Sequence, residues 1–248
     1  MKLTIIGSGA MAMALADGLH SHYKIEFIAR DENRLKEIAQ TFNSSYSILG
    51  DNDITDKNII LCVKPNAIGD VSQELVGSAR VVYSILAGTT IKEIKANISA
   101  RHTIRAMPNV AAAFGESATT LTGDIILREE AMDIFAKVGD SIWLNSEKEL
   151  DIATAIAGSG PAYLSLVAEA MMDGGVKQGL KRADSMRLVQ VLFGGFAPLI
   201  ASNHPALIKD SVMSPAGTTA SGYASLEEGG VRDSFIKAIE SAFKVTQK

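Results

Sequence analysis

A short glycine motif near the N-terminus constrains the fold more than any other feature of this chain. Gly7-x-Gly9-x-x-Ala12 stands between an apolar run over residues 3–6 and a stretch of helical spacing over residues 10–19. In this context Gly7 permits a tight turn, Gly9 lets the backbone approach a ligand, and the small Ala12 lets the helix pack on the strand. The motif predicts a pyrophosphate site at the start of a helix. Its predicted cofactor contacts are Gly7, Ser8, Gly9, Ala10 and Met11.

The first 146 residues alternate short apolar runs with amphipathic stretches, which is typical of a doubly wound sheet. Several runs are continuous enough to be buried on both faces, as in a parallel sheet. The predicted strands are 3–6, 25–29, 59–63, 81–86, 103–107 and 141–144. The predicted helices are 10–19, 33–42, 68–75, 91–98 and 129–137.

After Glu147 the alternation stops and long apolar helical stretches follow. The sequence therefore predicts an α/β fold, with an N-terminal Rossmann-type doubly wound sheet over residues 1–146 and an all-α C-terminal domain over residues 147–248. The predicted helices of that domain are 150–157, 162–178, 183–201, 205–212, 219–228 and 231–248. The stretch 188–200 is apolar nearly all round, so it predicts burial against a second chain, and Gly194 and Gly195 would let the two backbones approach.

The end of the second strand indicates which nicotinamide cofactor binds. An NAD enzyme usually places an acidic residue there to hold the ribose 2′-hydroxyl, whereas this chain has Ala29 followed by Arg30. Arg30 suits a 2′-phosphate and predicts NADPH, with NADH still possible. The alternative is that Arg30 is a solvated charge and that Asp31 takes the acidic role.

Two further segments are predicted at the carboxyl edge of the sheet, where ligands bind in such folds. Val63-Lys64-Pro65 ends one strand and is predicted to line the cofactor site. A lysine leaving a strand is more often a surface charge than a catalytic group. Asn109, after Met107-Pro108, is predicted to offer its amide to nicotinamide or substrate, with a plain turn residue as the alternative.

Two motifs stand out in the helical half. Gly158-Ser159-Gly160-Pro161 interrupts a helical stretch and predicts a cap before the next helix. Ser214-Pro215-Ala216-Gly217-Thr218-Thr219 predicts a second helix start, with Ser214 as N-cap and Pro215 as the first helical residue. Free amides and hydroxyls there would bind a carboxylate, and capping alone is the simpler alternative.

With these motifs in view, the chain resembles the pyrroline-5-carboxylate reductases over nearly its whole length. The glycine motif at Gly7, Val63-Lys64-Pro65, Met107-Pro108-Asn109, the segment 158–163 and the segment 214–219 match that family's landmarks in the same order. The resemblance implies an N-terminal NAD(P)H domain, a C-terminal helical dimerisation domain, and reduction of 1-pyrroline-5-carboxylate to proline. It also implies that Thr219 hydrogen-bonds the ring nitrogen as the catalytic residue, while Ser214, Gly217 and Thr218 hold the carboxylate.

The chain departs from the family pattern at two places. Val110-Ala111 follows Asn109 where the family usually has Thr-Pro, and Ala216 stands where the family has glycine. The methyl group of Ala216 is expected to narrow the space beside the carboxylate.

Composition excludes several other classes of partner. The net charge is −4 without a basic block, so neither nucleic acid nor an anionic membrane is expected. Cys62 is the only cysteine and the four histidines are scattered, which predicts no disulfide, no metal site and a cytoplasmic protein. Glycines interrupt the apolar N-terminal stretch, which favours strand, turn and helix over a signal peptide.

Three other functions compete with the predicted one. A reductase of another cyclic imine would share all these motifs. A β-hydroxyacid dehydrogenase would need a lysine where Leu164 stands. A nonenzymatic NADP-binding sensor would not need the segment 214–219.

Overall fold

A computed structural model describes residues 1–247, which divide into two compact units. The first unit holds Met1–Ser159 together with the C-terminal residues from Ser241, and the second holds Gly160–Glu240. The units thus divide between Ser159 and Gly160, within a helical stretch. The domain boundary predicted at residue 146 stays a prediction.

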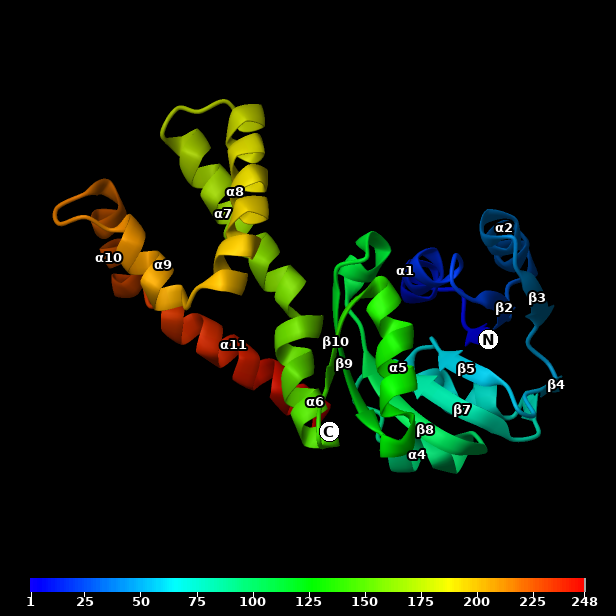
Figure 1. Ribbon diagram of the computed structural model, residues 1–248. Coiled ribbons are helices and arrows are strands. Elements are labelled where there is room, and N and C mark those ends of the chain that lie inside the picture. Colours follow the sequence, from blue (N-terminus) through cyan, green and yellow to red (C-terminus); the bar gives the residue numbers. More distant parts are fainter. Residues whose placement is uncertain (248) are drawn as a thin grey trace. The chain divides into compact units, whose positions relative to one another are not determined.

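The first unit is built on an eight-stranded sheet with the order β10-β9-β8-β7-β5-β1-β2-β3 (Figure 1). The six neighbouring strands β8-β7-β5-β1-β2-β3 are parallel to one another. β9 is antiparallel to β8, and β10 is parallel to β9. The predicted Rossmann-type sheet is therefore confirmed, with a mixed edge that was not predicted. The strands are β1 (Lys2–Ile6), β2 (Lys24–Ala29), β3 (Ser45–Ile48), β5 (Asn58–Leu61), β7 (Ala79–Ser84), β8 (Ala100–Met107), β9 (Ser117–Gly123) and β10 (Gly139–Trp143). Two-residue strands β4 (Asn52–Asp53) and β6 (Leu75–Val76) pair separately.

Helices cover both faces of this sheet and enclose two apolar clusters. One cluster packs α1 (Ala10–Leu19), α2 (Glu32–Phe42) and α5 (Arg128–Phe135) on the sheet. The other packs α3 (Ile68–Ser72) and α4 (Ile91–Asn97) on the opposite face. Four short 3-10 turns connect elements: η1 (Pro65–Ala67), η2 (Val110–Phe114), η3 (Ile125–Leu127) and η4 (Ala136–Val138).

The sequence did not predict β3 and β9. β3 is a four-residue strand at the sheet edge in which two serines alternate with Tyr46 and Ile48, so it has no apolar run. β9 carries three threonines that are buried in spite of their hydroxyls, among them Thr119 and Thr120. β3 is a strand because it pairs with β2, although none of its residues is buried. Tertiary burial, rather than local hydrophobicity, makes β9 a strand.

Among the described residues, the chain after β10 contains helices joined by short connections and no strand. Its elements are α6 (Glu147–Ala153), a π-helical segment η5 (Thr154–Gly158), α7 (Gly160–Lys177), α8 (Arg182–Ser202), α9 (Pro205–Val212), α10 (Thr218–Glu228) and α11 (Val231–Thr246). α6 and η5 belong to the first unit. The predicted helices are confirmed up to the described end of the chain, and the predicted last residue, Lys248, lies outside the described residues.

The second unit has almost no interior of its own. Among the described residues of α7, α9, α10 and α11 none is buried, and α8 buries only Ser185 and Val189. Two helical stretches, Glu147–Lys177 and Arg182–Ser202, are long and apolar enough by length and composition to cross a membrane. Because so few side chains of the second unit are buried, many of its large apolar side chains are exposed. They include Leu166, Leu188, Val191, Leu207 and Ile236, each more than half exposed.

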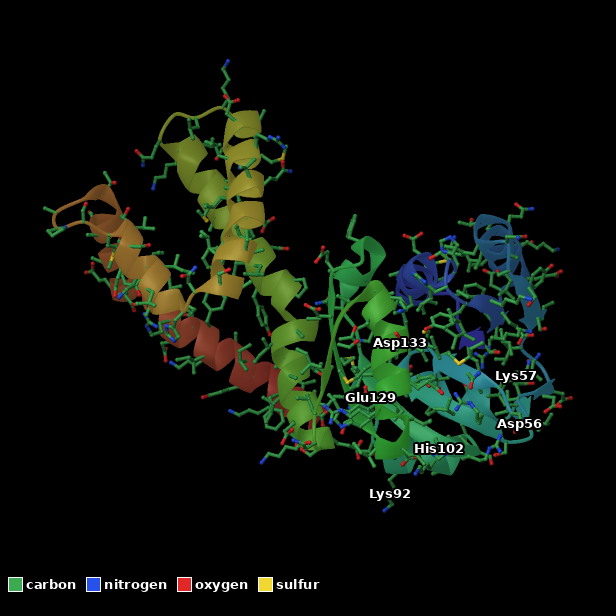
Figure 2. The ribbon with its side chains drawn as sticks, in the orientation of Figure 1. Asp56, Lys57, Lys92, His102, Glu129 and Asp133 are labelled. Carbon is green, nitrogen blue, oxygen red and sulfur yellow. The ribbon has the colours of Figure 1, made fainter. Side chains whose placement is uncertain are left out.

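A buried carboxylate joins the first two strands of the sheet. Glu26 on β2 is 8% exposed and accepts hydrogen bonds from Thr4 Oγ1 at 3.0 Å and from Lys57 Nζ at 2.9 Å. Burial by itself raises the pKa of Glu26, but the hydrogen bonds from Lys57 and Thr4 outweigh it and lower the pKa below its ordinary value. Lys57, labelled in Figure 2, lies directly before β5, so this ion pair ties β5 to β2.

Glu26→Gln should lower the free energy of unfolding by about 1–3 kcal/mol at pH 7, the range for a charge-assisted hydrogen bond. Because the folded-state pKa is depressed, the stabilisation by Glu26 is present above its unfolded pKa and is lost as the pH falls through the folded pKa. Urea unfolding at pH 7 and at lower pH checks this. The difference between parent and variant should shrink on acidification, and a constant difference would contradict the ionic origin.

Candidate active site

Three loops meet at the carboxyl edge of the sheet, one after each of the adjacent strands β2, β1 and β5. They enclose a cavity of about 300 Å³. Chain order reverses at β1, because β2 lies on one side and β5 on the other, and ligands bind at such switch points in α/β folds. The cavity is lined by Ile6, Gly7, Ser8, Gly9, Ile28, Ala29, Arg30, Asp31, Leu49, Cys62, Val63, Lys64, Ala67 and Val71.

The two glycines of the first loop are needed for different structural reasons. Gly7 has φ +125°, and a Cβ there would lie 2.4 Å from the backbone oxygen of Cys62. Gly9 has φ −78°, which any residue adopts, and a Cβ there would meet nothing within 4 Å. Gly7 is thus required by the protein itself, whereas Gly9 keeps open a space at the start of α1.

That space fits the pyrophosphate of a dinucleotide. No side chain caps the first turn of α1, so its leading N–H groups point into the open region. Ala10 is exposed and Met11 half-buried in this first turn, and neither lines the cavity. The residues present fit the cofactor: backbone amides for the phosphates, and an apolar wall of Leu49, Ala67 and Val71 for a flat ring. No local pattern in the sequence predicts that wall.

The loop after β2 places a positive charge at the cavity. The side chain of Arg30 is 61% exposed, and its Nη2 lies 3.9 Å from Asp70 Oδ2, a weak pair that leaves the guanidinium accessible. Asp31 also lines the cavity, but its Oδ1 accepts the N–H of Arg34 at 3.0 Å and caps α2. The carboxylate of Asp31, the alternative ribose contact, is therefore already hydrogen-bonded as the N-cap of α2.

The loop after β5 contributes mainly backbone and apolar surface. β5 ends at Leu61, and Lys64 precedes η1 with Pro65 as its first residue. Val63 and Lys64 line the cavity, whereas Pro65 is exposed and does not. Burial raises the pKa of the Cys62 thiol, which disfavours the thiolate form.

Asn109 lies outside the cavity lining, and its amide contacts the protein on both sides. Its Oδ1 accepts the N–H of Ala111 at 3.0 Å and caps η2, and its Nδ2 donates to the carbonyl oxygen of Ala157 at 2.9 Å. Both ends of the Asn109 amide are therefore hydrogen-bonded within the protein, and the contact to nicotinamide stays a prediction.

The segment 214–219 lies in the second unit, and its predicted cap is wrong in detail. α10 begins at Thr218 with Gly217 as N-cap, not at Pro215 with Ser214 as cap. Gly217 N–H donates to Ser214 O at 3.0 Å, which closes a turn with Pro215 and Ala216 at its centre. Proline as second residue and a positive φ at the third, +60° at Ala216, are typical of a type II turn.

This turn explains why glycine is the usual residue where Ala216 stands. A type II turn favours glycine at its third position, and alanine there costs roughly 1 kcal/mol. The methyl group therefore strains the backbone as well as occupying space. A Cβ at Gly217 would lie 2.4 Å from Ser214 Oγ, which a rotation of the serine side chain relieves, and 3.1 Å from the Ser214 carbonyl oxygen. Thr218 and Thr219 are both exposed in the first turn of α10, where no side chain caps the helix.

The cap predicted at Ser159 to Pro161 is also wrong. The helix continues through this segment as η5 and α7, and Ser159 itself has helical φ and ψ. Ser159 N–H donates to Thr154 O at 3.1 Å, a bond over five residues. The segment from Gly158 to Pro161 thus accompanies a π-helical turn, a feature frequent at functional sites, and does not begin a new helix.

Together the sheet topology, the glycine loop and the cavity define a Rossmann-type dinucleotide-binding protein. Residues 2–88 match the family model described as NADP oxidoreductase, coenzyme F420-dependent. Residues 147–248 match the model described as pyrroline-5-carboxylate reductase dimerisation.

Relatives narrow this class to one family. Pyrroline-5-carboxylate reductases of Helicobacter pylori and Thermus thermophilus are 32% and 33% identical, over 98% of this chain and 97% and 96% of theirs. The crystal structure of the Streptococcus pyogenes enzyme superposes with a TM-score of 0.85 at 29% identity, covering 99% of this chain and 98% of that one. The Plasmodium falciparum pyrroline carboxylate reductase, solved with NADP bound, gives 0.81 at 26% identity with the same coverage. The chain belongs to the pyrroline-5-carboxylate reductase family.

Proposed function

We propose that this chain reduces 1-pyrroline-5-carboxylate to proline with NADPH. The observation that carries the proposal is the full-length match to reductases of this name, together with the open pyrophosphate space at Gly9 and the uncapped, exposed start of α10. A carboxylate and a cyclic imine are the two groups that this chemistry must hold.

NADPH, when bound, supplies the hydride for the imine carbon. The backbone of Gly7, Ser8, Gly9, Ala10 and Met11 holds the pyrophosphate, Arg30 the 2′-phosphate, and Val63, Lys64 and Pro65 border the cofactor. Ser214, Gly217 and Thr218 hold the substrate carboxylate. Thr219 would hydrogen-bond the ring nitrogen, the atom at which the charge changes when the C=N bond is reduced. A protonated imine needs alignment more than an acid, which agrees with the absence of His, Asp and Glu from these motifs.

Oxidation of NADPH, followed by absorbance, tests the proposal with 1-pyrroline-5-carboxylate beside its six-membered homologue. The five-membered imine should give the higher kcat/KM and yield proline. Preference for the larger ring would assign another imine to this site. NADPH binding without turnover of either imine would favour the nonenzymatic sensor.

Arg30→Asp should raise the KM for NADPH by roughly tenfold to a hundredfold, the effect of losing a charge-assisted contact to phosphate. The KM for NADH should change little, because NADH has no 2′-phosphate. Steady-state kinetics with both cofactors check this. Arg34→Asp, on the exposed start of α2, is the control for a general change in surface charge. Equal effects of Arg30→Asp on both cofactors would contradict the assignment.

We further propose that the active species is at least a homodimer formed by the helical unit, in the cytoplasm. The exposed apolar side chains of α7 and α8 support this, because such surface in water indicates a partner. Light scattering on active protein at micromolar concentration should give at least twice the 26.3 kDa chain mass. Full activity in a monomer would overturn the proposal. Leu188→Asp should weaken association, whereas Glu32→Lys on α2 of the first unit should not.

A further inference from the structure

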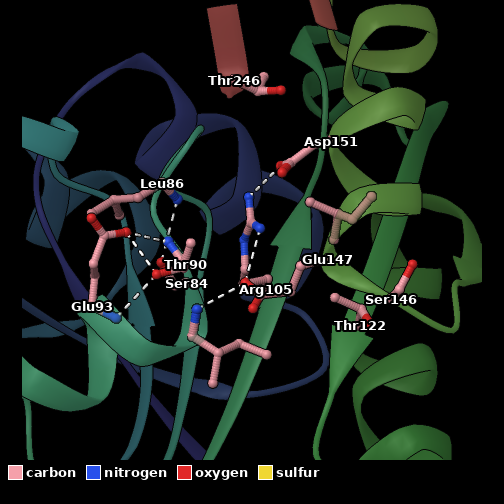
Figure 3. Close-up of polar contacts among 12 residues, drawn as sticks. Ser84, Leu86, Thr90, Glu93, Arg105, Thr122, Ser146, Glu147, Asp151 and Thr246 are labelled. Carbon is pink, nitrogen blue, oxygen red and sulfur yellow. Dashed lines mark hydrogen bonds and ion pairs between the residues drawn. The ribbon is translucent and has the colours of Figure 1, made fainter. Parts of the chain in front are cut away.

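Two arginines lie near the carboxyl ends of the strands, and their charges are neutralised to different degrees. Arg105, near the end of β8, is 1% exposed, and its guanidinium contacts Glu147 Oε1 at 3.0 Å and Asp151 Oδ1 at 2.7 Å (Figure 3). Arg30, directly after β2, is exposed, and its one ion pair within residues 1–247 is with Asp70, at 3.9 Å. The charge of Arg30 is therefore available to a ligand, whereas two carboxylates already balance that of Arg105.

The helix that carries Asp70 places it beside the cavity. α3 buries Val71, which is 3% exposed, in the apolar cluster on its face of the sheet. Val71 and Ala67 both line the cavity, and Asp70 lies between them along the chain. The backbone around Asp70 is thus held at the cavity, while its side chain is 72% exposed and its Oδ2 lies beside the guanidinium of Arg30.

Two carboxylates flank Arg30, and they differ in their hydrogen bonds. The carboxylate of Asp31 accepts the N–H of Arg34 and caps α2. Within the described residues, the carboxylate of Asp70 accepts no hydrogen bond, and Arg30 is its one cationic partner. Asp70 is therefore the acidic group whose interaction with Arg30 can change when a ligand enters.

This ion pair has different consequences for the two nicotinamide cofactors. An NAD site usually carries an acidic residue at the end of its second strand, where it holds the ribose 2′-hydroxyl. Here β2 ends at Ala29, and α3 supplies a carboxylate next to the guanidinium of Arg30 instead. A 2′-phosphate on Arg30 would share that guanidinium with Asp70, and it carries about two negative charges of its own. NADH has no 2′-phosphate and meets no such competition.

We propose that Asp70 is a specificity-determining residue for the cofactor: its carboxylate competes with the 2′-phosphate for Arg30 and so limits the preference for NADPH over NADH. The inference deepens the proposed function and rests on it, because it takes the cavity as the cofactor site. Asp70 has no part in hydride transfer, so the quantity that changes is affinity.

Fluorescence titration with NADPH and with NADH, in the absence of an imine, compares the parent, Asp70→Asn, Arg30→Gln and the double variant. Asparagine keeps the size of the side chain and removes its charge. We expect Asp70→Asn to lower the Kd for NADPH by roughly threefold to tenfold, because one exposed charge no longer opposes a phosphate of about two charges. The Kd for NADH should stay within about twofold. In the Arg30→Gln background the gain for NADPH should fall to about twofold or less, because the shared guanidinium is gone.

Asp56→Asn is the matched control for the change in net charge. Asp56, labelled in Figure 2, pairs with Arg101 and lies two residues before β5, at the amino edge of the sheet. Its loss should leave both Kd values within about twofold, because salt screens exposed charges over such a separation. Weaker NADPH binding in Asp70→Asn would overturn the inference, since Asp70 would then orient Arg30 for the phosphate. Equal tightening of both cofactors, or an equal gain without Arg30, would also overturn it.

These outcomes separate the inference from the proposed function. If the parent reduces 1-pyrroline-5-carboxylate with NADPH but Asp70→Asn leaves the ratio of the two Kd values unchanged, the inference fails and the proposed function stands. If the ratio shifts as expected but the parent reduces no imine, the inference stands and the proposed reaction fails. A parent that binds no NADPH would overturn both.

Discussion

Gly9→Ala should leave the fold intact and weaken NADPH binding by roughly tenfold to a hundredfold. The φ of −78° suits alanine, and the added Cβ would meet no protein atom within 4 Å, so the free protein has no reason to lose stability. The methyl group would instead occupy the space where a pyrophosphate approaches the start of α1. Overpacking of about 1–3 kcal/mol in the complex corresponds to this loss of affinity.

Gly7→Ala is the matched control, because the same methyl group there clashes with the protein. The Cβ would lie 2.4 Å from the Cys62 carbonyl oxygen, at a φ of +125° that disfavours side chains. We expect Tm to fall by several degrees for Gly7→Ala and to stay near the parent value for Gly9→Ala. Fluorescence titration with NADPH and thermal unfolding measure both variants. If Gly9→Ala bound NADPH as the parent does, the pyrophosphate would have to lie elsewhere.

The fold was predictable where local pattern and tertiary burial agree. β1, β2, β5, β7 and β8 are apolar runs between helices, and their order along the chain is enough to predict a parallel sheet. β9 has no such run, because its threonines are buried by contact with β8 and β10 rather than by their own hydrophobicity. The antiparallel edge of the sheet was missed for this reason.

The site was predictable in its parts that follow from topology. Residues after β1, β2 and β5 had to meet at one edge, and Gly7, Arg30 and Lys64 do line one cavity. What failed was local backbone geometry at two prolines. Pro215 is the second residue of a turn, not the first of a helix, and Pro161 stands inside a continuing helix. The same residue type is compatible with each of these conformations, so its neighbours in space decide between them.

The hydroxyl at the start of α10 gives the largest effect expected on catalysis. Thr219 is exposed in a first turn that no side chain caps, and deleting one aligned donor at a site of charge change typically costs about tenfold to a thousandfold in rate. Thr219→Ala should therefore lower kcat/KM by that range while the fold is kept. Thr219→Ser, which retains the hydroxyl, should be far milder.

Ser221→Ala is the control on the same helix. Ser221 is also exposed, but two residues along an α-helix rotate its side chain by roughly 200°, away from the direction of Thr219. Its loss should leave kcat/KM within about twofold of the parent. If Thr219 acts on the ring nitrogen only as charge changes there, kcat and kcat/KM fall together in Thr219→Ala, whereas a contact made equally in the ground state would raise KM alone. An alanine variant as active as the parent would remove the hydroxyl from the reaction and leave the amides of Gly217 and Thr218 as the groups that position the substrate.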